Sequence, residues 1–236
     1  MKNNLQIKIF ADGADFEEMI KFSKNPQIKG LTTNPSLMKK AGILDYEEFS
    51  KKILTHIQDK PISLEVFTDD LKEMERQAIK IASWGSNVYV KIPITNTKKK
   101  STLELAKRLN SLKIKLNITA IFTESQLNEV KKFLDPQIKN YISVFAGRIA
   151  DTGVNPSKII SKAVSIANNL KNTEVIWASC RELLNIFEAD NLGCHIITVP
   201  HVILSKLHLV GYDHEEYSLD TVKEFYQDSI KVGYKI

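Results

Sequence analysis

The sequence predicts an α/β fold, a single (β/α)8 barrel with an additional C-terminal helix. Short apolar runs rich in β-branched residues recur eight times, amphipathic stretches separate them, and one more amphipathic segment follows the last run. Strand–helix alternation implies parallel strands joined by crossover helices, and eight such units close naturally into a barrel. The chain's 236 residues suit one domain of this kind, so we expect residues 1–236 to form a single domain.

The expected strands are nearly continuous apolar runs, as is typical of strands that are covered on both faces. In chain order they are Ile7–Ala11, Gly30–Thr33, Ile62–Phe67, Val88–Ile92, Lys115–Phe122, Tyr141–Ala146, Glu174–Ala178 and His195–Val199. The segments between them, such as DLKEMERQAIKIASWG, have helical periodicity, and Asp69 or Asp70 can cap the helix that starts near Leu71. The final helix is expected in SLDTVKEFYQDSIKVGY. A doubly wound open sheet is the rival fold, but no G-x-G-x-x-G follows the first strand.

Composition excludes several classes of function. The net charge of +5 is compatible with mild basicity or with an anionic ligand. The basic run Lys98–Lys100 lacks an aromatic strand signature, so no nucleic-acid partner is expected. Two cysteines without metal-ligand spacing predict neither a disulfide framework nor a metal site, and they favour a reducing compartment. Without a signal peptide or an 18-residue apolar run, we expect a cytoplasmic protein with no membrane partner.

Polar side chains occur near the carboxyl ends of the predicted strands, where a barrel has its active-site mouth. They are Asp12, Thr32, Thr33, Asn34, Glu65, Lys91, Asn117, Thr119, Ser143, Arg148, Ser179 and Arg181. Each has a simpler explanation when it is taken alone. For example, Lys91 could be an outward-pointing strand lysine, Asp12 a turn residue and Asn34 a turn opener before proline. Convergence on one cavity would explain the whole set.

Lys91 is the most reactive candidate of this set. Burial in an apolar barrel disfavours the ammonium form, and a neutral amine attacks carbonyl groups to form a Schiff base. The iminium withdraws electrons from the adjacent carbon and permits reversible cleavage of the next carbon–carbon bond. Asp12 and Glu65 are candidate acid–base groups, working through a water held by Thr119.

The remaining polar residues have the chemistry of a sugar-phosphate site. Thr33, Asn34, Asn117 and Ser143 can bind hydroxyl groups. Ser179 and Arg181 precede a predicted helix, where the dipole favours an anion such as phosphate, and Arg148 could be a second clamp.

Three further residues near the predicted site have less specific signals. His195 and His201 flank the eighth strand, and structural roles are favoured over a role as catalytic base. Cys180 lies beside the predicted phosphate site, and a small buried residue is favoured over a reactive thiol.

At this point the motifs resemble those of a known family, the transaldolases. GLTTNPSL resembles the family signature, YVKIP its Schiff-base strand and LNITAIFT its fifth strand. ISVFAGRIADTG, ASCRE and ITVP resemble the later motifs, in the expected order over nearly the whole chain. The resemblance covers transaldolases and the small fructose-6-phosphate aldolases. It implies a class I, Schiff-base enzyme without a cofactor or a metal.

The resemblance also implies a role for each matching residue. Lys91 matches the Schiff-base lysine, Asp12 the acid–base residue, and Glu65 with Thr119 the pair that holds the catalytic water. Asn34, Asn117 and Ser143 match the donor-sugar binders, whereas Arg148, Ser179 and Arg181 match the phosphate site.

Two residues favour the transaldolase branch, because the aldolases usually have glutamine and tyrosine where this chain has Glu65 and Phe145. The expected reaction is transfer of a dihydroxyacetone unit from fructose 6-phosphate or sedoheptulose 7-phosphate to an aldose phosphate. The alternatives are an aldolase that releases dihydroxyacetone and a non-catalytic barrel that binds sugar phosphates.

The chain also departs from the family pattern. Val144 stands where proline is usual, and Gly13 lacks a hydroxyl that is common after the first-strand aspartate, so the pathway stays open between the pentose phosphate pathway and a specialised one. VKEFYQDSIK resembles the helix that packs on neighbouring subunits in the small subfamily, which implies a homo-oligomer.

Overall fold

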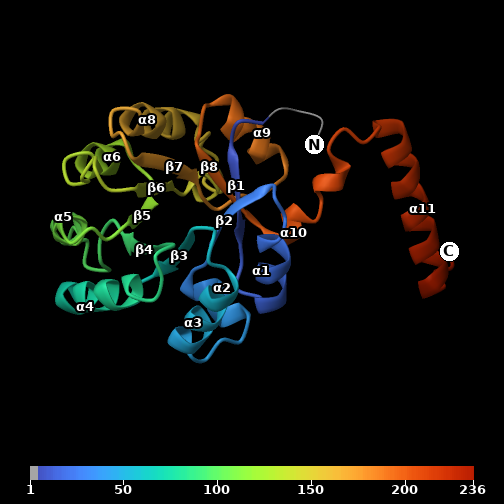
Figure 1. Ribbon diagram of the computed structural model, residues 1–236. Coiled ribbons are helices and arrows are strands. Elements are labelled where there is room, and N and C mark those ends of the chain that lie inside the picture. Colours follow the sequence, from blue (N-terminus) through green and yellow to red (C-terminus); the bar gives the residue numbers. More distant parts are fainter. Residues whose placement is uncertain (1–4) are drawn as a thin grey trace.

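The computed structural model describes residues 5–236 and shows a closed barrel of parallel strands in sequential order (Figure 1). The strands are β1 Lys8–Asp12, β2 Ile28–Thr32, β3 Ile62–Glu65, β4 Val88–Pro93, β5 Leu116–Ile121, β6 Asn140–Val144, β7 Thr173–Trp177 and β8 Ile196–Pro200. The predicted fold is therefore confirmed, and every strand end lies within two residues of its expected position.

The crossover helices surround the barrel (Figure 1). They are α1 Phe16–Ser23, α2 Pro35–Lys40, α3 Tyr46–His56, α4 Leu71–Ala82, α5 Leu103–Ser111, α6 Glu124–Val130, α7 Ala146–Ala150, α8 Ser157–Ala167 and α9 Leu184–Asn191. After the last strand, β8, comes the short helix α10 His201–Leu204. A 3-10 turn, η1 Leu207–Leu209, precedes the last helix, α11 His214–Val232. The short helices α7 and α10 begin almost directly after β6 and β8, so they lie at the carboxyl end of the barrel.

Aromatic rings fill part of the barrel interior. Tyr89 and Tyr141 stack with their ring centroids 4.1 Å apart and a 12° interplanar angle, and Phe10 meets Tyr141 edge-on at 5.8 Å. Gly30 is needed beside this cluster, because a Cβ atom there would lie 2.5 Å from Cζ of Phe10. Tyr89 and Tyr141 are the second residues of β4 and β6, and Phe10 is the middle residue of β1, so the carboxyl ends of these strands are left for polar side chains.

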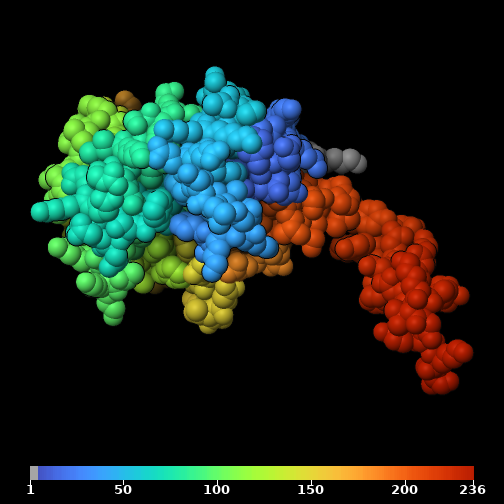
Figure 2. Space-filling view, turned by 90° about the horizontal axis from the view of Figure 1, so that it is seen from below, coloured from blue at the N-terminus to red at the C-terminus, as the bar shows by residue number. Residues whose placement is uncertain are grey.

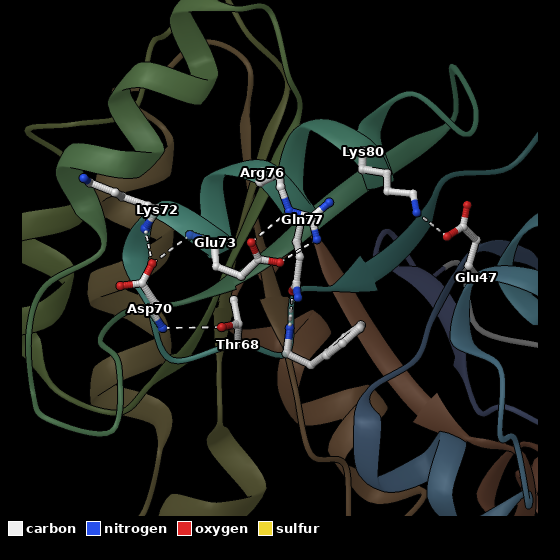
Figure 3. Close-up of polar contacts among 9 residues, drawn as sticks. Glu47, Thr68, Asp70, Lys72, Glu73, Arg76, Gln77 and Lys80 are labelled. Atoms are coloured by element: carbon white, nitrogen blue, oxygen red, sulfur yellow. Dashed lines mark hydrogen bonds and ion pairs between the residues drawn. The ribbon is translucent and has the colours of Figure 1, made fainter.

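The loop that follows β3 is anchored to α4 (Figure 3). The backbone N–H of Phe67 donates to Oε1 of Gln77 at 3.0 Å. Asp70 caps α4 by accepting from the backbone N–H groups of Lys72 and Glu73 at 3.0 and 2.9 Å, which confirms one of the two predicted caps. These contacts fix the segment that comes directly after Glu65.

Helix α11 stands apart from the barrel (Figures 1 and 2). None of its residues is buried, although Val222, Phe225, Tyr226 and Ile230 are large and apolar. Their spacing of three and four residues places them along one side of the helix. Within residues 5–236, no helix is long and apolar enough to span a membrane.

Candidate active site

A polar cavity of about 240 Å³ opens at the carboxyl end of the barrel. Its lining is Asp12, Thr32, Asn34, Ser36, Leu37, Lys91, Asn117, Thr119, Ser143, Phe145, Arg148, Ala178, Ser179, Cys180, Arg181, Thr198 and Pro200. The structure thus brings together most of the residues that the sequence singled out. Thr33 and Glu65 do not line the cavity, but both contact Lys91. A larger hollow of about 880 Å³ lies at the amino end and contains none of the predicted site residues.

Lys91 is buried, with only 6% of its surface exposed. Its Nζ donates to the backbone carbonyl of Thr33 at 2.8 Å and forms an ion pair with Oε2 of Glu65 at 3.0 Å. The pair arises from the strand register, in which Glu65 of β3 lies directly beside Lys91 of β4. Glu65 therefore lies within hydrogen-bond reach of the amine and is placed to exchange a proton with it.

Glu65 is itself held by Tyr46, the first residue of α3. The Tyr46 hydroxyl donates to the carbonyl of Glu65 at 2.9 Å and accepts from its N–H at 2.8 Å. Sequence reasoning missed Tyr46, because an aromatic residue at the start of an amphipathic helix gives no signal of a partner in a distant strand. Oγ1 of Thr119 is buried and has no hydrogen-bond partner within residues 5–236. It is therefore available to a ligand or a water.

Asp12 ends β1 and is linked to two threonines. Its Oδ1 accepts from Oγ1 of Thr32 at 2.7 Å, and Oγ1 of Thr32 also hydrogen-bonds Oγ1 of Thr198 on β8. Burial raises the pKa of the Asp12 carboxyl above its ordinary value, although the Thr32 hydrogen bond and the charge of Lys91 oppose the rise. A raised pKa makes the carboxylate a stronger base, which suits a group that accepts a proton and later returns it. Thr198 was missed, although a polar residue inside the apolar run IITVP was a usable signal.

Asn117 is fixed between two neighbouring serines. Its Nδ2 donates to Oγ of Ser63 at 3.1 Å, and its Oδ1 accepts from Oγ of Ser143 at 2.7 Å. All three residues are buried, so this network sets which way the amide of Asn117 points into the cavity. Asn34 caps α2 through its Oδ1, which accepts from the N–H of Leu37 at 3.0 Å, and this leaves Nδ2 as a donor.

Two residues at the cavity have positive φ without being glycine. Ala120, next to Thr119, has φ +58°, and the β5–β6 register shifts between Ile118 and Ile121. Ser179, at the end of β7, has φ +66°. Such a conformation costs about 1–2 kcal/mol for a residue with a Cβ atom. Backbone strain of this kind concentrates where a site requires a particular side-chain direction.

Two arginines border the outer part of the cavity. Arg181 forms a two-pronged ion pair with Asp151, with Nε donating to Oδ1 at 3.0 Å. The same pair holds the pKa of the Asp151 carboxyl below its usual range. The guanidinium of Arg148 lies 5.5 Å from the ring centroid of Phe145. Asp151 was missed as a partner of Arg181, although it belongs to the motif GRIAD.

Cys180 lies among these groups but is buried and not paired with Cys194, since both thiols are free. Burial raises the pKa of the Cys180 thiol to about 12. The thiol therefore stays protonated at neutral pH and is a poor nucleophile, in agreement with the predicted packing role.

Comparison with known proteins identifies the relatives of this chain. The family described as "Transaldolase/Fructose-6-phosphate aldolase" matches residues 9–236. A "Probable transaldolase" of Thermoanaerobacter sp. (strain X514) is 36% identical over 231 residues, which cover 98% of this chain and 100% of that protein. Another from Clostridium kluyveri (strain ATCC 8527) is 36% identical over 203 residues, 85% of this chain and 89% of that one.

A solved structure supports the fold alone. The crystal structure of a "putative lyase/mutase" from Burkholderia cenocepacia J2315 superposes with a TM-score of 0.54 at 12% identity, covering 84% of this chain and 77% of that one. Because the family match extends over nearly the whole chain and includes every cavity-lining residue, this chain belongs to the transaldolase/fructose-6-phosphate aldolase family.

Proposed function

We propose that this chain is a transaldolase that transfers a dihydroxyacetone unit from a ketose phosphate to an aldose phosphate through a Schiff base on Lys91. The observation that carries the proposal is the position of Nζ of Lys91. It is buried beside a polar cavity, between the Glu65 carboxylate and the Thr33 carbonyl. A lysine amine with a nearby proton acceptor is a nucleophile for carbonyl carbons.

The proposed reaction begins when the Lys91 ammonium passes a proton to Glu65 and the free amine attacks the ketose carbonyl. Glu65 then returns its proton to the hydroxyl of the carbinolamine, and loss of water gives the iminium and restores the Glu65 carboxylate. Asp12 then removes the proton of the C4 hydroxyl, the C3–C4 bond breaks, and its electron pair moves into the iminium to form an enamine. The shortened aldose leaves, and the enamine attacks the carbonyl of an incoming aldose while Asp12 returns the proton. Water then hydrolyses the new iminium, which releases the ketose product and frees the Lys91 amine. Asn117, Ser143 and the other cavity hydroxyls hold the sugar during both steps.

Borohydride reduction tests this mechanism against a barrel that only binds sugars. With fructose 6-phosphate present, reduction should trap the donor carbons on Lys91, and peptide mass mapping should locate the adduct. Absence of an adduct on Lys91 would contradict the Schiff-base proposal.

A second assay separates transfer from release. Neither the Glu65 carboxylate nor the Phe145 ring has a hydroxyl proton to give to the enamine. Protonation of the enamine should therefore be slow compared with its attack on an aldose. Glyceraldehyde 3-phosphate should therefore form faster from fructose 6-phosphate when erythrose 4-phosphate is added. Equal rates with and without an added aldose would favour the aldolase alternative.

Arg181 is proposed to bind the substrate phosphate together with Arg148 and Ser179. Arg181→Ala should raise KM for phosphorylated sugars by roughly 10- to 150-fold, since a charged hydrogen bond contributes about 1.5–3 kcal/mol. KM for unphosphorylated acceptors should change little. Arg108→Ala is the matched control, because Arg108 also forms an exposed two-pronged pair, with Glu75, outside the cavity lining. An equal loss for both kinds of acceptor would show that Arg181 does not bind phosphate.

We further propose that the chain forms a homo-oligomer in the cytoplasm, where sugar phosphates are metabolised. Helix α11 supports this, because it projects from the barrel with Val222, Phe225 and Ile230 exposed. Another copy of the chain could cover this apolar side. Phe225→Glu with Ile230→Glu should convert the oligomer to monomers in analytical ultracentrifugation, whereas Lys223→Glu with Lys231→Glu, on the same helix, should not. A wild-type monomer at micromolar concentration would contradict the proposal.

A further inference from the structure

His201 occupies an unusual place behind the candidate active site. It is the first residue of α10, directly after β8, and only 9% of its surface is exposed. Its Nδ1 lies 2.6 Å from Oε2 of Glu18 on α1, and its ring centroid lies 4.8 Å from that of Phe22. Its Nε2 is buried and has no hydrogen-bond partner within residues 5–236. A buried, unpartnered imidazole nitrogen is not explained by packing alone.

Gly13 makes room for this ring. A Cβ atom on Gly13 would lie 2.3 Å from Cε1 and 2.6 Å from Nε2 of His201. Gly13 does not have positive φ, so its backbone conformation does not require glycine. The requirement comes from the imidazole, which occupies the space that a side chain at position 13 would need.

Gly13 directly follows Asp12, so the imidazole lies close behind the candidate acid–base residue. Lys91 of β4 and Glu65 of β3 are the charged groups that face Asp12 from inside the barrel, and the Cys180 thiol follows β7. From outside, α10 contributes His201 and α1 contributes Glu18, whereas β8 contains no titratable residue. A positive charge on His201 lowers the pKa of the Asp12 carboxyl, against the larger effect of burial.

We propose that His201 is a positioning residue for Asp12. Glu18 orients the imidazole, Gly13 admits it, and the ring packs behind the end of β1 that carries Asp12, where its charge acts on that carboxyl. This role is additional to those in the proposed function. It rests on the proposed function only because that function assigns the acid–base step to Asp12.

A double-mutant cycle tests the claim that the imidazole of His201 packs against Gly13. Gly13→Ala should lower the Tm of the wild type, because the new methyl group collides with a ring that is held on its other side by Phe22 and Glu18. In a His201→Ala background the same substitution should have little further effect, because the ring is gone. The Tm loss of the double variant should therefore be clearly smaller than the sum of the two single losses. Additive losses would overturn the claim that the ring and Gly13 share one space.

Titration of the carbon-13 resonance of the Asp12 carboxyl tests the claim that the charge of His201 acts on Asp12. The resonance is assigned by its disappearance from the spectrum of Asp12→Asn. Its titration can be followed without measuring enzymatic activity. His201→Gln keeps a polar side chain that can still hydrogen-bond Glu18 but never carries a charge. The Asp12 titration should move to higher pH in this variant, and also in Glu18→Gln, which removes the carboxylate that contacts Nδ1 of the imidazole. His208→Gln is the matched control, because His208 is exposed on η1, and it should leave the titration unchanged.

The outcomes separate this inference from the proposed function. An unchanged Asp12 titration in His201→Gln and Glu18→Gln would overturn the inference even if Lys91 forms the borohydride adduct. A shifted titration without an adduct on Lys91 would support the inference and contradict the transaldolase proposal. If both hold, the acid limb of the kcat/KM pH profile should shift in the same direction as the carboxyl titration. A profile that stays fixed while the carboxyl shifts would overturn the link between His201 and catalysis.

Discussion

Replacing Lys91 by arginine is expected to abolish turnover. The guanidinium keeps the positive charge and can keep the ion pair with Glu65, which lies 3.0 Å from the native ammonium. It stays protonated at all relevant pH values, however, and cannot form an imine. The loss should therefore appear in kcat for both transfer and release, and the borohydride adduct should disappear.

Lys115→Arg is the control for this change. Lys115 is a partly buried lysine directly before β5, with Nζ 5.0 Å from the ring centroid of Tyr89, and it lies at the amino end of the barrel. This variant should retain the wild-type kcat, because a larger basic side chain at the amino end of the barrel does not reach the cavity. Measurable turnover by Lys91→Arg with a normal Tm would show that catalysis does not require an imine at this residue.

The barrel could be predicted because each strand carries a local signal. A strand that is buried on both faces needs β-branched and apolar residues. This requirement depends little on which other strand lies next to it. Contacts between residues on adjacent strands could not be predicted in this way. The contact between Glu65 and Lys91 depends on the β3–β4 register, which the sequence does not display, so Glu65 could be singled out but its direct partner could not.

Two contacts that the sequence does not reveal share a physical cause. Tyr46 holds both backbone groups of Glu65 through its hydroxyl, and Gly13 accommodates the ring of His201. In each case a residue at or beside the end of one element contacts a residue of another element, and that contact exists only after the barrel closes. A tyrosine on an amphipathic helix and a glycine after a strand have common local explanations, so neither pattern identifies its distant partner.

Strained positions were also beyond the reach of the sequence. Ala120 and Ser179 have ordinary residue types, yet both have positive φ beside the cavity. Nothing about an alanine or a serine predicts a left-handed backbone, because that conformation is imposed by the surroundings. By contrast, Arg148, Ser179 and Arg181 were predicted as a group, because helix starts and basic side chains after strands have a direct chemical meaning for an anion.

The second large effect is expected at Gly147, where the two segments of the proposed phosphate site touch. A Cβ atom on Gly147 would lie 1.6 Å from the backbone carbonyl oxygen of Ser179 and 2.7 Å from its carbonyl carbon. The backbone N–H of Gly147 also donates to the carbonyl of Ala178 at 3.3 Å. Gly147→Ala must therefore push α7 away from the end of β7, and backbone cannot yield as a flexible side chain can.

We expect Gly147→Ala to destabilise the protein by about 3 kcal/mol or more, which corresponds to a Tm loss of about 6–12 °C for a chain of this size. Gly153→Ala is the matched control in the same region. Gly153 has φ +80° but no atom within 4 Å of an added Cβ, so it should lose only about 1–2 kcal/mol from backbone strain. Because α7 carries Arg148 and the β7 end carries Ser179 and Arg181, the Gly147 variant should also raise KM for phosphorylated sugars, and the control should not. A Gly147→Ala protein as stable as the Gly153→Ala protein would show that α7 can shift freely, and the close contact would then not be what holds the two halves of the phosphate site together.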